Sequence, residues 1–150
     1  MTGLDDTRHQ LLAMLERASR QVDILSPQLE PSLLDDPDIV DALTQLTRRG
    51  RQSRIRIVIR EYVPSQLGRH RLILLTQRLT SSMSLRVLPN HPEWNRETVI
   101  RIDHLATLLL LPEDKRINWY EQPADIQRWR ERFDRLWNAS TPSPELRRLL

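Results

Sequence analysis

Short apolar runs separated by amphipathic helical stretches recur along this chain, and their alternation is the strongest constraint on its fold. The clearest run is Arg54–Arg60, where apolar side chains first alternate with arginines and then become continuous over Ile57–Ile59. This pattern predicts a strand that is buried on one face and largely buried on the other. Helices and strands that alternate without an internal repeat predict an α/β fold with a mixed sheet flanked by helices.

The same periodicities locate the other strands. Three further short runs predict strands at 22–25, 85–88 and 117–120. The longer segment 98–111 predicts one or two strands, bent or turned near Asp103 and His104.

Helical spacing of apolar residues predicts four helices, at about 5–18, 37–49, 64–80 and from Pro123 onward. The first helix would be capped by Asp5, Asp6 or Thr7, and the second would end at Gly50. The last helix is strongly amphipathic. Residues 27–37 contain three prolines and are expected to form a loop.

A chain of 150 residues is long enough for one domain with a sizeable core and too short for two ordinary ones. We expect a single domain over residues 1–140 and a proline-led C-terminal extension over 141–150. The longest apolar run, Leu108–Leu111, is far shorter than a membrane span. Charged residues near the N-terminus argue against a signal peptide and the lack of cysteine suits a reducing compartment, so we expect a cytoplasmic location.

Basic residues are concentrated in the middle of the chain. Between Ala42 and Pro92 there are ten arginines and one acid, Glu61, so this segment carries a net charge of +9 although the whole chain carries only +3. The segment either binds phosphate or an acidic partner, or it faces the acidic residues of the chain within the fold or across a dimer. Its arginines are Arg48, Arg49, Arg51, Arg54, Arg56, Arg60, Arg69, Arg71, Arg78 and Arg86.

The composition excludes several kinds of catalytic site. The three glycines lie too far apart to form a phosphate-binding loop, and Lys115 is the only lysine. The four histidines are scattered without the spacing of metal ligands, and the motifs of zinc proteases and serine hydrolases do not occur. We therefore expect no metal site, no cofactor and no catalytic residues.

Two arginines interrupt the apolar face of the helix expected at 64–80. When successive residues are placed about 100° apart, Arg71 and Arg78 fall inside the arc formed by the leucines of this helix. A buried guanidinium needs an anionic partner. We expect that partner to be an acid at the edge of the core, or else a ligand or a partner molecule; alternatively, the aliphatic stems carry the guanidinium groups out to solvent. The candidate acids are Asp23, Asp103 and Glu30.

Two considerations predict where an anion would bind. Residues 68–71 lie near the start of that same helix, where backbone N–H groups attract anions. Open α/β sheets also bind ligands at the carboxyl ends of their strands, which here are the ends of the strands at 22–25 and 54–60. The candidate anion-binding residues are Ser26, Arg60, Arg69, His70, Arg71 and Arg78.

Several segments, taken in order, carry a resemblance to a known family. They are Ser-Pro-Gln-Leu-Glu-Pro at 26–31 with Leu34 and Asp35, Gly-Arg-His-Arg-Leu at 68–72, Gln-Arg-Leu at 77–79 with Ser81, and Pro-Glu-Leu-Arg-Arg-Leu at 144–149. Together with the order of the elements, they make the chain similar to a bacterial phospholipase D-like domain family of unknown function. Members of that family occur alone or fused to acetyltransferases. The resemblance implies a phospholipase D-like half domain.

The resemblance does not extend to the catalytic signature of phospholipase D enzymes. That signature is His-x-Lys-x-x-x-x-Asp, in which histidine is the nucleophile, lysine holds the phosphate and aspartate orients the histidine. At the expected strand, His104 is followed by Ala106 and then by Leu111, and no histidine of this chain has lysine two residues later. The resemblance therefore implies a relative that is not an enzyme.

Two functions remain open for such a relative. It would be a binding module with an arginine-lined cleft for a phosphate-containing ligand or nucleic acid. Alternatively, it would be a protein–protein interaction or assembly domain that binds an acidic protein and takes no small-molecule ligand. Because catalytic phospholipase D-like proteins pair two such halves, a single half also predicts a homodimer. An acetyltransferase-associated protein is a further expected partner.

Overall fold

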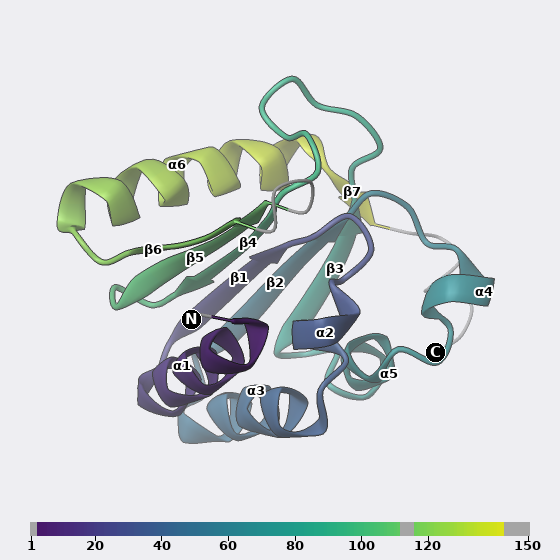
Figure 1. Ribbon diagram of the computed structural model, residues 1–150. Helices are drawn as coiled ribbons and strands as arrows, with labels where there is room; N and C mark the ends of the chain where they lie inside the picture. The colour runs from purple at the N-terminus through teal and green to yellow at the C-terminus, as the bar shows by residue number, and fades with distance from the viewer. Residues whose placement is uncertain (1–2, 112–115, 143–150) are drawn as a thin grey trace.

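The computed structural model describes residues 3–111 and 116–142, and its centre is a seven-stranded sheet in the order β6-β5-β4-β1-β2-β3-β7 (Figure 1). The strands are β1 (Gln21–Leu25), β2 (Arg54–Ile59), β3 (Met83–Val87), β4 (Thr98–Ile102), β5 (Ala106–Leu111), β6 (Arg116–Tyr120) and β7 (Thr141–Pro142). The helices are α1 (Leu4–Arg17), α2 (Pro31–Leu34), α3 (Pro37–Arg49), α4 (Pro64–Leu67), α5 (Arg71–Arg78) and α6 (Pro123–Ala139).

The sheet is mixed. β1, β2 and β3 are parallel neighbours, whereas β4 runs antiparallel to β1. β5 and β6 then continue as an antiparallel meander. Because β4 is antiparallel to β1, the start of β4 lies at the same edge of the sheet as the carboxyl ends of β1 and β2.

Helices cover both faces of this sheet (Figure 1). α1, α3 and α5 lie on one face, where Leu11, Leu43 and Leu72 belong to a large buried core. α6 lies on the other face and buries Phe133 and Leu136 in a smaller core. The predicted mixed α/β fold, with its flanking helices and amphipathic C-terminal helix, is confirmed. None of the described helices is both long and apolar enough to cross a membrane.

The prediction of one helix over 64–80 is wrong, because the chain forms α4 and α5 with a break at 68–70. At Gly68 the backbone passes so close to the preceding turn that an added Cβ would lie 2.6 Å from the carbonyl oxygen of Pro64. His70 then caps α5, since its Nδ1 accepts a hydrogen bond from the N–H of Leu72 (3.1 Å). The angular positions of residues around the axis of α5 therefore cannot be counted from Leu67, which belongs to α4.

Arg71 and Arg78 are exposed as a result, and the prediction that they are desolvated is wrong. The side chain of Arg71 is 53% exposed. Its Nη1 donates to the backbone oxygen of Asp35 (3.0 Å), and its N–H donates to Asp35 Oδ1 (2.9 Å). The partner of Arg71 is thus a loop aspartate and not one of the predicted acids, which were Asp23, Asp103 and Glu30.

Several smaller predictions also differ from the structure. The predicted loop 27–37 contains the short helix α2. α1 begins at Leu4 with Gly3 as its N-cap, and no side chain caps it, so the predicted caps are wrong. The segment 98–111 forms two strands, β4 and β5, and Asp103 in the turn between them has a positive φ of 46°.

The start of the predicted extension belongs to the sheet. Thr141 and Pro142 form β7, which pairs with β3. The resemblance-bearing segment 144–149 lies outside the described residues. The domain boundary at residue 140 stays a prediction.

A buried carboxylate at the centre of the sheet holds two arginines. Asp23 of β1 has no exposed surface, and its register partners are Arg56 on β2 and Arg101 on β4. Arg56 donates from Nε to Asp23 Oδ1 (2.8 Å) and from Nη2 to Oδ2 (3.0 Å), and Arg101 donates to the same Oδ2. Arg56 also pairs with Asp134 of α6 (2.9 Å). We call these four residues the Asp23 cluster.

The Asp23 cluster is electrically neutral, which is the condition for burying charged groups at an acceptable cost. Burial acts to lower the pKa of both arginines. In Arg101 burial outweighs the attraction of Asp23, so its pKa is lowered. In Arg56 burial is overcome by Asp23 and Asp134 together, so its pKa is raised. Both guanidinium groups stay protonated.

Replacement of Asp23 by asparagine is expected to lower the free energy of unfolding by on the order of 3–5 kcal/mol, because two buried guanidinium groups then face one carboxylate. Urea denaturation followed by circular dichroism measures the change. Asp41→Asn, at an exposed position on α3, is the control and is expected to stay within about 0.5 kcal/mol of the parent protein. Equal effects of the two substitutions would contradict a stabilising role for the Asp23 cluster.

Candidate anion-binding site

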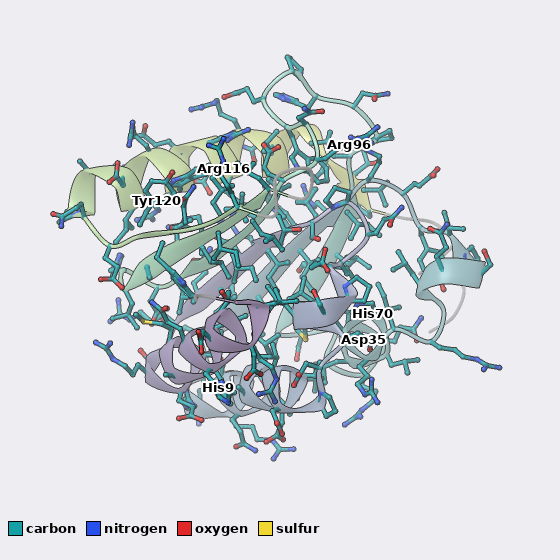
Figure 2. The ribbon with its side chains drawn as sticks, in the orientation of Figure 1. His9, Asp35, His70, Arg96, Arg116 and Tyr120 are labelled. Atoms are coloured by element: carbon teal, nitrogen blue, oxygen red, sulfur yellow. The ribbon has the colours of Figure 1, made fainter. Side chains whose placement is uncertain are left out.

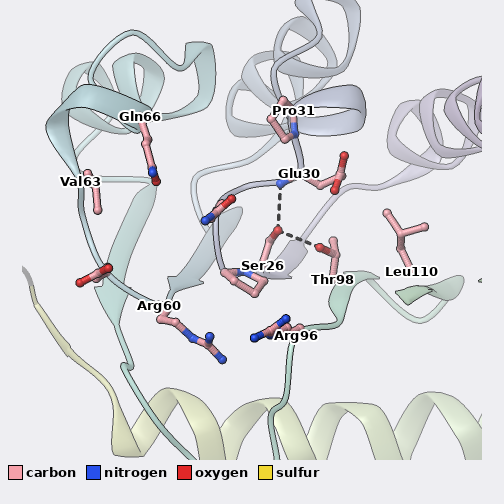
Figure 3. Close-up of a pocket in the computed structure, with 12 residues that line it drawn as sticks. Ser26, Glu30, Pro31, Arg60, Val63, Gln66, Arg96, Thr98 and Leu110 are labelled. Atoms are coloured by element: carbon pink, nitrogen blue, oxygen red, sulfur yellow. Dashed lines mark hydrogen bonds between the residues drawn. The ribbon is translucent and has the colours of Figure 1, made fainter. Parts of the chain in front are cut away.

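A pocket of about 450 Å³ opens at the carboxyl ends of β1 and β2, beside the start of β4 (Figure 3). Ser26 directly follows β1, Arg60 directly follows β2, and Thr98 is the first residue of β4. This is the edge at which open α/β sheets bind ligands. The polar side chains that line it include Ser26, Glu30, Arg60, Glu61, Arg96 and Thr98.

One wall of the pocket is the loop that joins β1 to α2. The Oγ of Ser26 lies 2.8 Å from Thr98 Oγ1 and accepts a hydrogen bond from the N–H of Glu30 (3.0 Å). Between them, Leu29 is buried and has a positive φ of 53°. The left-handed conformation costs a leucine on the order of 1–2 kcal/mol, so contacts on either side of it must hold the loop.

His70 supplies one of these contacts. Its ring is buried, its Nδ1 accepts from the N–H of Leu72 (3.1 Å), and its Nε2 lies 2.8 Å from the backbone oxygen of Leu29. Because Nδ1 acts as an acceptor, Nε2 carries the proton and donates to Leu29. Both ring nitrogens are therefore used in joining the pocket loop to α5.

Two arginines reach the pocket from opposite sides and point toward each other (Figure 3). Arg60 donates from Nη2 to the backbone oxygen of Asn95 (2.6 Å), which ties the end of β2 to the loop before β4. The Nε of Arg60 is buried and has no hydrogen-bond partner among the described residues. Arg96 enters from that same loop. The two guanidinium groups that face each other are the feature of this pocket that suits an anion.

The loop that carries Arg96 is fixed by the buried side chain of Glu97. Glu97 Oε2 accepts hydrogen bonds from the N–H groups of Asn95 (3.1 Å) and Arg96 (3.0 Å). Its Oε1 forms an ion pair with Arg132 of α6 (2.5 Å). The backbone of Arg96 is thus held against α6 before any ligand binds.

The pocket also carries two acids. Glu30 and Glu61 belong to its lining, and Glu30 Oε1 accepts a hydrogen bond from Ser32 Oγ (2.5 Å). Two arginines and two glutamates give these side chains no net charge. The arrangement suits a ligand that offers an anionic group to the arginines and hydrogen-bond donors to the glutamates.

The structure brings together two of the predicted anion-binding residues, Ser26 and Arg60, in this pocket. Arg69 and His70 line an adjacent hollow of about 220 Å³, which also includes Asp35 and shares Gln28, Pro31 and Gln66 with the pocket. In Figure 2, Asp35 and His70 lie together, well apart from Arg96. Arg71 and Arg78 line neither space, and the first N–H groups of α5 are taken by Asp35 and His70.

Two pocket residues, Arg96 and Thr98, escaped sequence reasoning. Arg96 stands in a segment that showed only loop character, and Thr98 reads as the ordinary start of a strand. Only the sheet topology places them at the pocket, because β4 is antiparallel to β1 and so begins at the edge where β1 ends. The sequence does not show that β4 is the neighbour of β1.

The position expected for the catalytic histidine lies elsewhere. His104 is exposed in the turn between β4 and β5, at the opposite end of β4 from Thr98. Within residues 3–111 and 116–142, no group of three or more histidine, aspartate or glutamate side chains is arranged to hold a metal ion.

A family profile described as a domain of unknown function (DUF7931) matches residues 3–149. The chain belongs to this family. No curated protein matches the sequence. The function of the DUF7931 domain must therefore be argued from its own residues.

The solved structures that resemble this DUF7931 domain include two proteins. One is TrmBL2, an archaeal chromatin protein that binds DNA, with a TM-score of 0.65, 15% identity, and coverage of 95% of this chain and 52% of TrmBL2. The other is NucT from Helicobacter pylori, with a TM-score of 0.67, 12% identity, and coverage of 93% of this chain and 92% of NucT. The chain thus spans about half of TrmBL2 and nearly all of NucT. At these identities the likeness shows a shared fold.

The two roles of His70 predict that His70→Ala destabilises the fold. The substitution leaves the Leu29 carbonyl and the Leu72 N–H without partners, and each buried unsatisfied group costs about 1–3 kcal/mol. We expect a loss of about 2–4 kcal/mol in the free energy of unfolding by urea denaturation. His104→Ala, in an exposed turn, is the control and is expected to change it by less than about 0.5 kcal/mol. A tolerated His70→Ala would show that the loop is held by other contacts.

Proposed function

We propose that this protein is a non-catalytic phospholipase D-like domain that binds a phosphate-containing ligand in the pocket at the carboxyl edge of its sheet. The observation that carries the proposal is the pair of guanidinium groups, of Arg60 and Arg96, that face each other across the pocket. Guanidinium groups bind phosphate oxygens in pairs through their planar forks. Two such groups facing each other can hold one phosphate between them.

The acids of the pocket narrow the class of ligand. Glu30 and Glu61 would repel a bare polyanion, whereas they accept hydrogen bonds from hydroxyl or amino groups. A phosphate monoester with neighbouring hydroxyl groups satisfies both the arginines and the glutamates. The proposed ligand is therefore a small hydroxylated phosphate ester.

The spacing of the phospholipase D signature supports the non-catalytic reading. Along β4 the same spacing, two and then five residues, also falls on Arg96, Thr98 and Asp103, which is a second placement besides the one that begins at His104. Arginine stays protonated and so cannot serve as the nucleophile that histidine provides. Threonine carries no positive charge to hold phosphate. The carboxylate of Asp103 lies at the other end of β4, where it accepts hydrogen bonds from the backbone N–H groups of residues 19–21.

Isothermal titration with ribose 5-phosphate as the probe tests this binding site. Arg60→Met and Arg96→Met are each expected to weaken binding about tenfold or more, because a hydrogen bond to a charged group contributes about 1.5–3 kcal/mol. Arg48→Met, on the exposed last turn of α3, is the matched control and is expected to leave the affinity unchanged. Absence of binding to the parent protein, or equal losses in all three variants, would refute the proposed site.

The protein is expected not to hydrolyse phosphodiesters, because the signature histidine and lysine are absent. Release of nitrophenol from bis(p-nitrophenyl) phosphate measures this directly. The variants Arg60→Met, His70→Ala and His104→Ala serve as controls for any activity that is found. Turnover that disappears in one of these variants would overturn the non-catalytic assignment.

Assembly through an apolar surface has less support. Among the described residues, Leu4 and Leu74 are the large apolar side chains that are exposed, and they do not form a patch of the size that interfaces use. A homodimer, an acetyltransferase-associated partner and a cytoplasmic location stay predictions. Light scattering at micromolar protein concentration measures the oligomeric state. A mass near 17.8 kDa, that of one chain, would contradict the homodimer.

A further inference from the structure

A second hollow, of about 630 Å³, lies at the opposite end of the sheet, where β1 and β2 begin. It is formed by the connections from α1 to β1 and from α3 to β2, which Figure 1 shows at the same end of the sheet. We call it the amino-end hollow. The side chains that line it are Ser19, Arg20, Gln21, Arg51, Gln52 and Arg54.

The sheet itself brings three arginines together in this hollow. The N–H of Arg54 donates to the backbone oxygen of Arg20 (2.8 Å), so these two residues are neighbours across the β1–β2 pair. Arg51 lies in the turn that leads into β2. All three side chains are exposed, so their positive charges are accessible.

Some arginines elsewhere on this surface are paired with acids. Arg8 pairs with Asp36 (2.5 Å), and Arg135 pairs with Glu93 (2.7 Å). Within the described part of the chain, Arg20, Arg51 and Arg54 make no ion pair, and no acid lines the amino-end hollow. Three guanidinium groups are therefore gathered without a neutralising partner.

A carboxylate lies close to the amino-end hollow but is already satisfied. Asp103 accepts hydrogen bonds from the N–H groups of Ser19 (2.8 Å), Arg20 (3.1 Å) and Gln21 (2.6 Å). These contacts fix the backbone of residues 19–21 and leave the arginine side chains unpaired. Asp103 thus shapes the hollow, and its single charge leaves a net charge of +2 on the three arginines and this carboxylate.

We infer that the amino-end hollow is a sequence-independent binding site for the phosphodiester backbone of nucleic acid. Arginine, glutamine and serine side chains are the residue types that contact backbone phosphates. Among the described residues, no aromatic side chain on which a base could stack lines the hollow. Binding here would therefore depend on charge and report nothing about base sequence.

Other anionic partners fit the hollow less well. A small organic anion would find no apolar surface to cover its body, since the lining side chains are all polar or charged. An acidic protein would find no aromatic or aliphatic anchor at the centre of the contact. A long polyanion needs neither feature.

Fluorescence anisotropy with a short fluorescein-labelled DNA duplex tests the inference over about 50–200 mM salt. Each phosphate contact contributes about 0.9 to the slope of log affinity against log salt, so three contacts give a slope of about −2.7. The triple variant R20Q/R51Q/R54Q is expected to lose this slope. Its dissociation constant is expected to rise on the order of 100-fold at 0.1 M salt.

The triple variant R128Q/R130Q/R135Q is the matched control, because it removes the same charge from exposed positions on α6. It is expected to retain the salt slope and most of the affinity. An equal loss in both variants would show that net charge alone governs binding and would overturn the site. Failure of the parent protein to bind the duplex would overturn it as well. Urea midpoints confirm that both variants are folded.

A further comparison separates this site from the pocket at the carboxyl edge. The double variant R60M/R96M is expected to bind the duplex normally while losing ribose 5-phosphate, and R20Q/R51Q/R54Q is expected to show the reverse. Loss of duplex binding in R60M/R96M would place nucleic acid in the pocket and overturn the assignment to the amino-end hollow.

Discussion

The contact on which the rest of this structure depends is the ion pair between Asp23 and its two cross-strand arginines. Asp23 lies directly opposite Arg56 on β2 and Arg101 on β4. A one-residue slip of either strand would turn a charged side chain to the opposite face of the sheet. The Asp23 cluster therefore specifies the register of the three central strands, a role for which buried charges are well suited even where they add little stability. The same register sets Ser26, which directly follows β1, opposite Thr98 of β4, each three residues from the cluster along the chain, and both residues line the pocket.

Sequence periodicity was sufficient for the elements and their class, because burial imposes one spacing on helices and another on strands. It failed at Gly68, where a close approach to the Pro64 carbonyl breaks a helix that the apolar pattern continues. The predicted burial of Arg71 and Arg78 was wrong for the same reason, because the angular position of a residue can be counted only within one unbroken helix. The pocket was half predicted. Ser26 and Arg60 follow strands in an obvious way, whereas Arg96 depends on how the loop before β4 is tied to α6 by Glu97.

The uneven charge of the chain now has a physical explanation in two parts. Some arginines of the basic middle segment have structural partners, since Arg56 binds Asp23, Arg49 donates to carbonyl oxygens at the end of α1, and Arg86 stacks on Trp137. Of these contacts, the ion pair of Arg56 with Asp23 joins a basic and an acidic part of the chain within the fold. Other arginines of the segment, such as Arg51 and Arg54, have no such partner among the described residues. Pairing within the fold therefore applies to some of these arginines, and binding of an external anion remains a proposal for the others.

The two candidate sites differ because the two ends of a parallel strand pair present different groups. At the carboxyl edge, loops leave the strands and fold back over the sheet, so they enclose a pocket lined by two arginines and two acids, which suits a small ligand. At the amino edge, the chain enters β1 and β2 from helix ends and stays exposed, so arginines there form an open, positive surface. β1, which carries Asp23, runs from the amino edge to the carboxyl edge. β4 runs the other way, from Thr98 at the pocket to Ile102, and Asp103 follows it beside the amino-end hollow. Because the Asp23 cluster holds these strands in one register, neither site needs the other to be occupied in order to keep its shape.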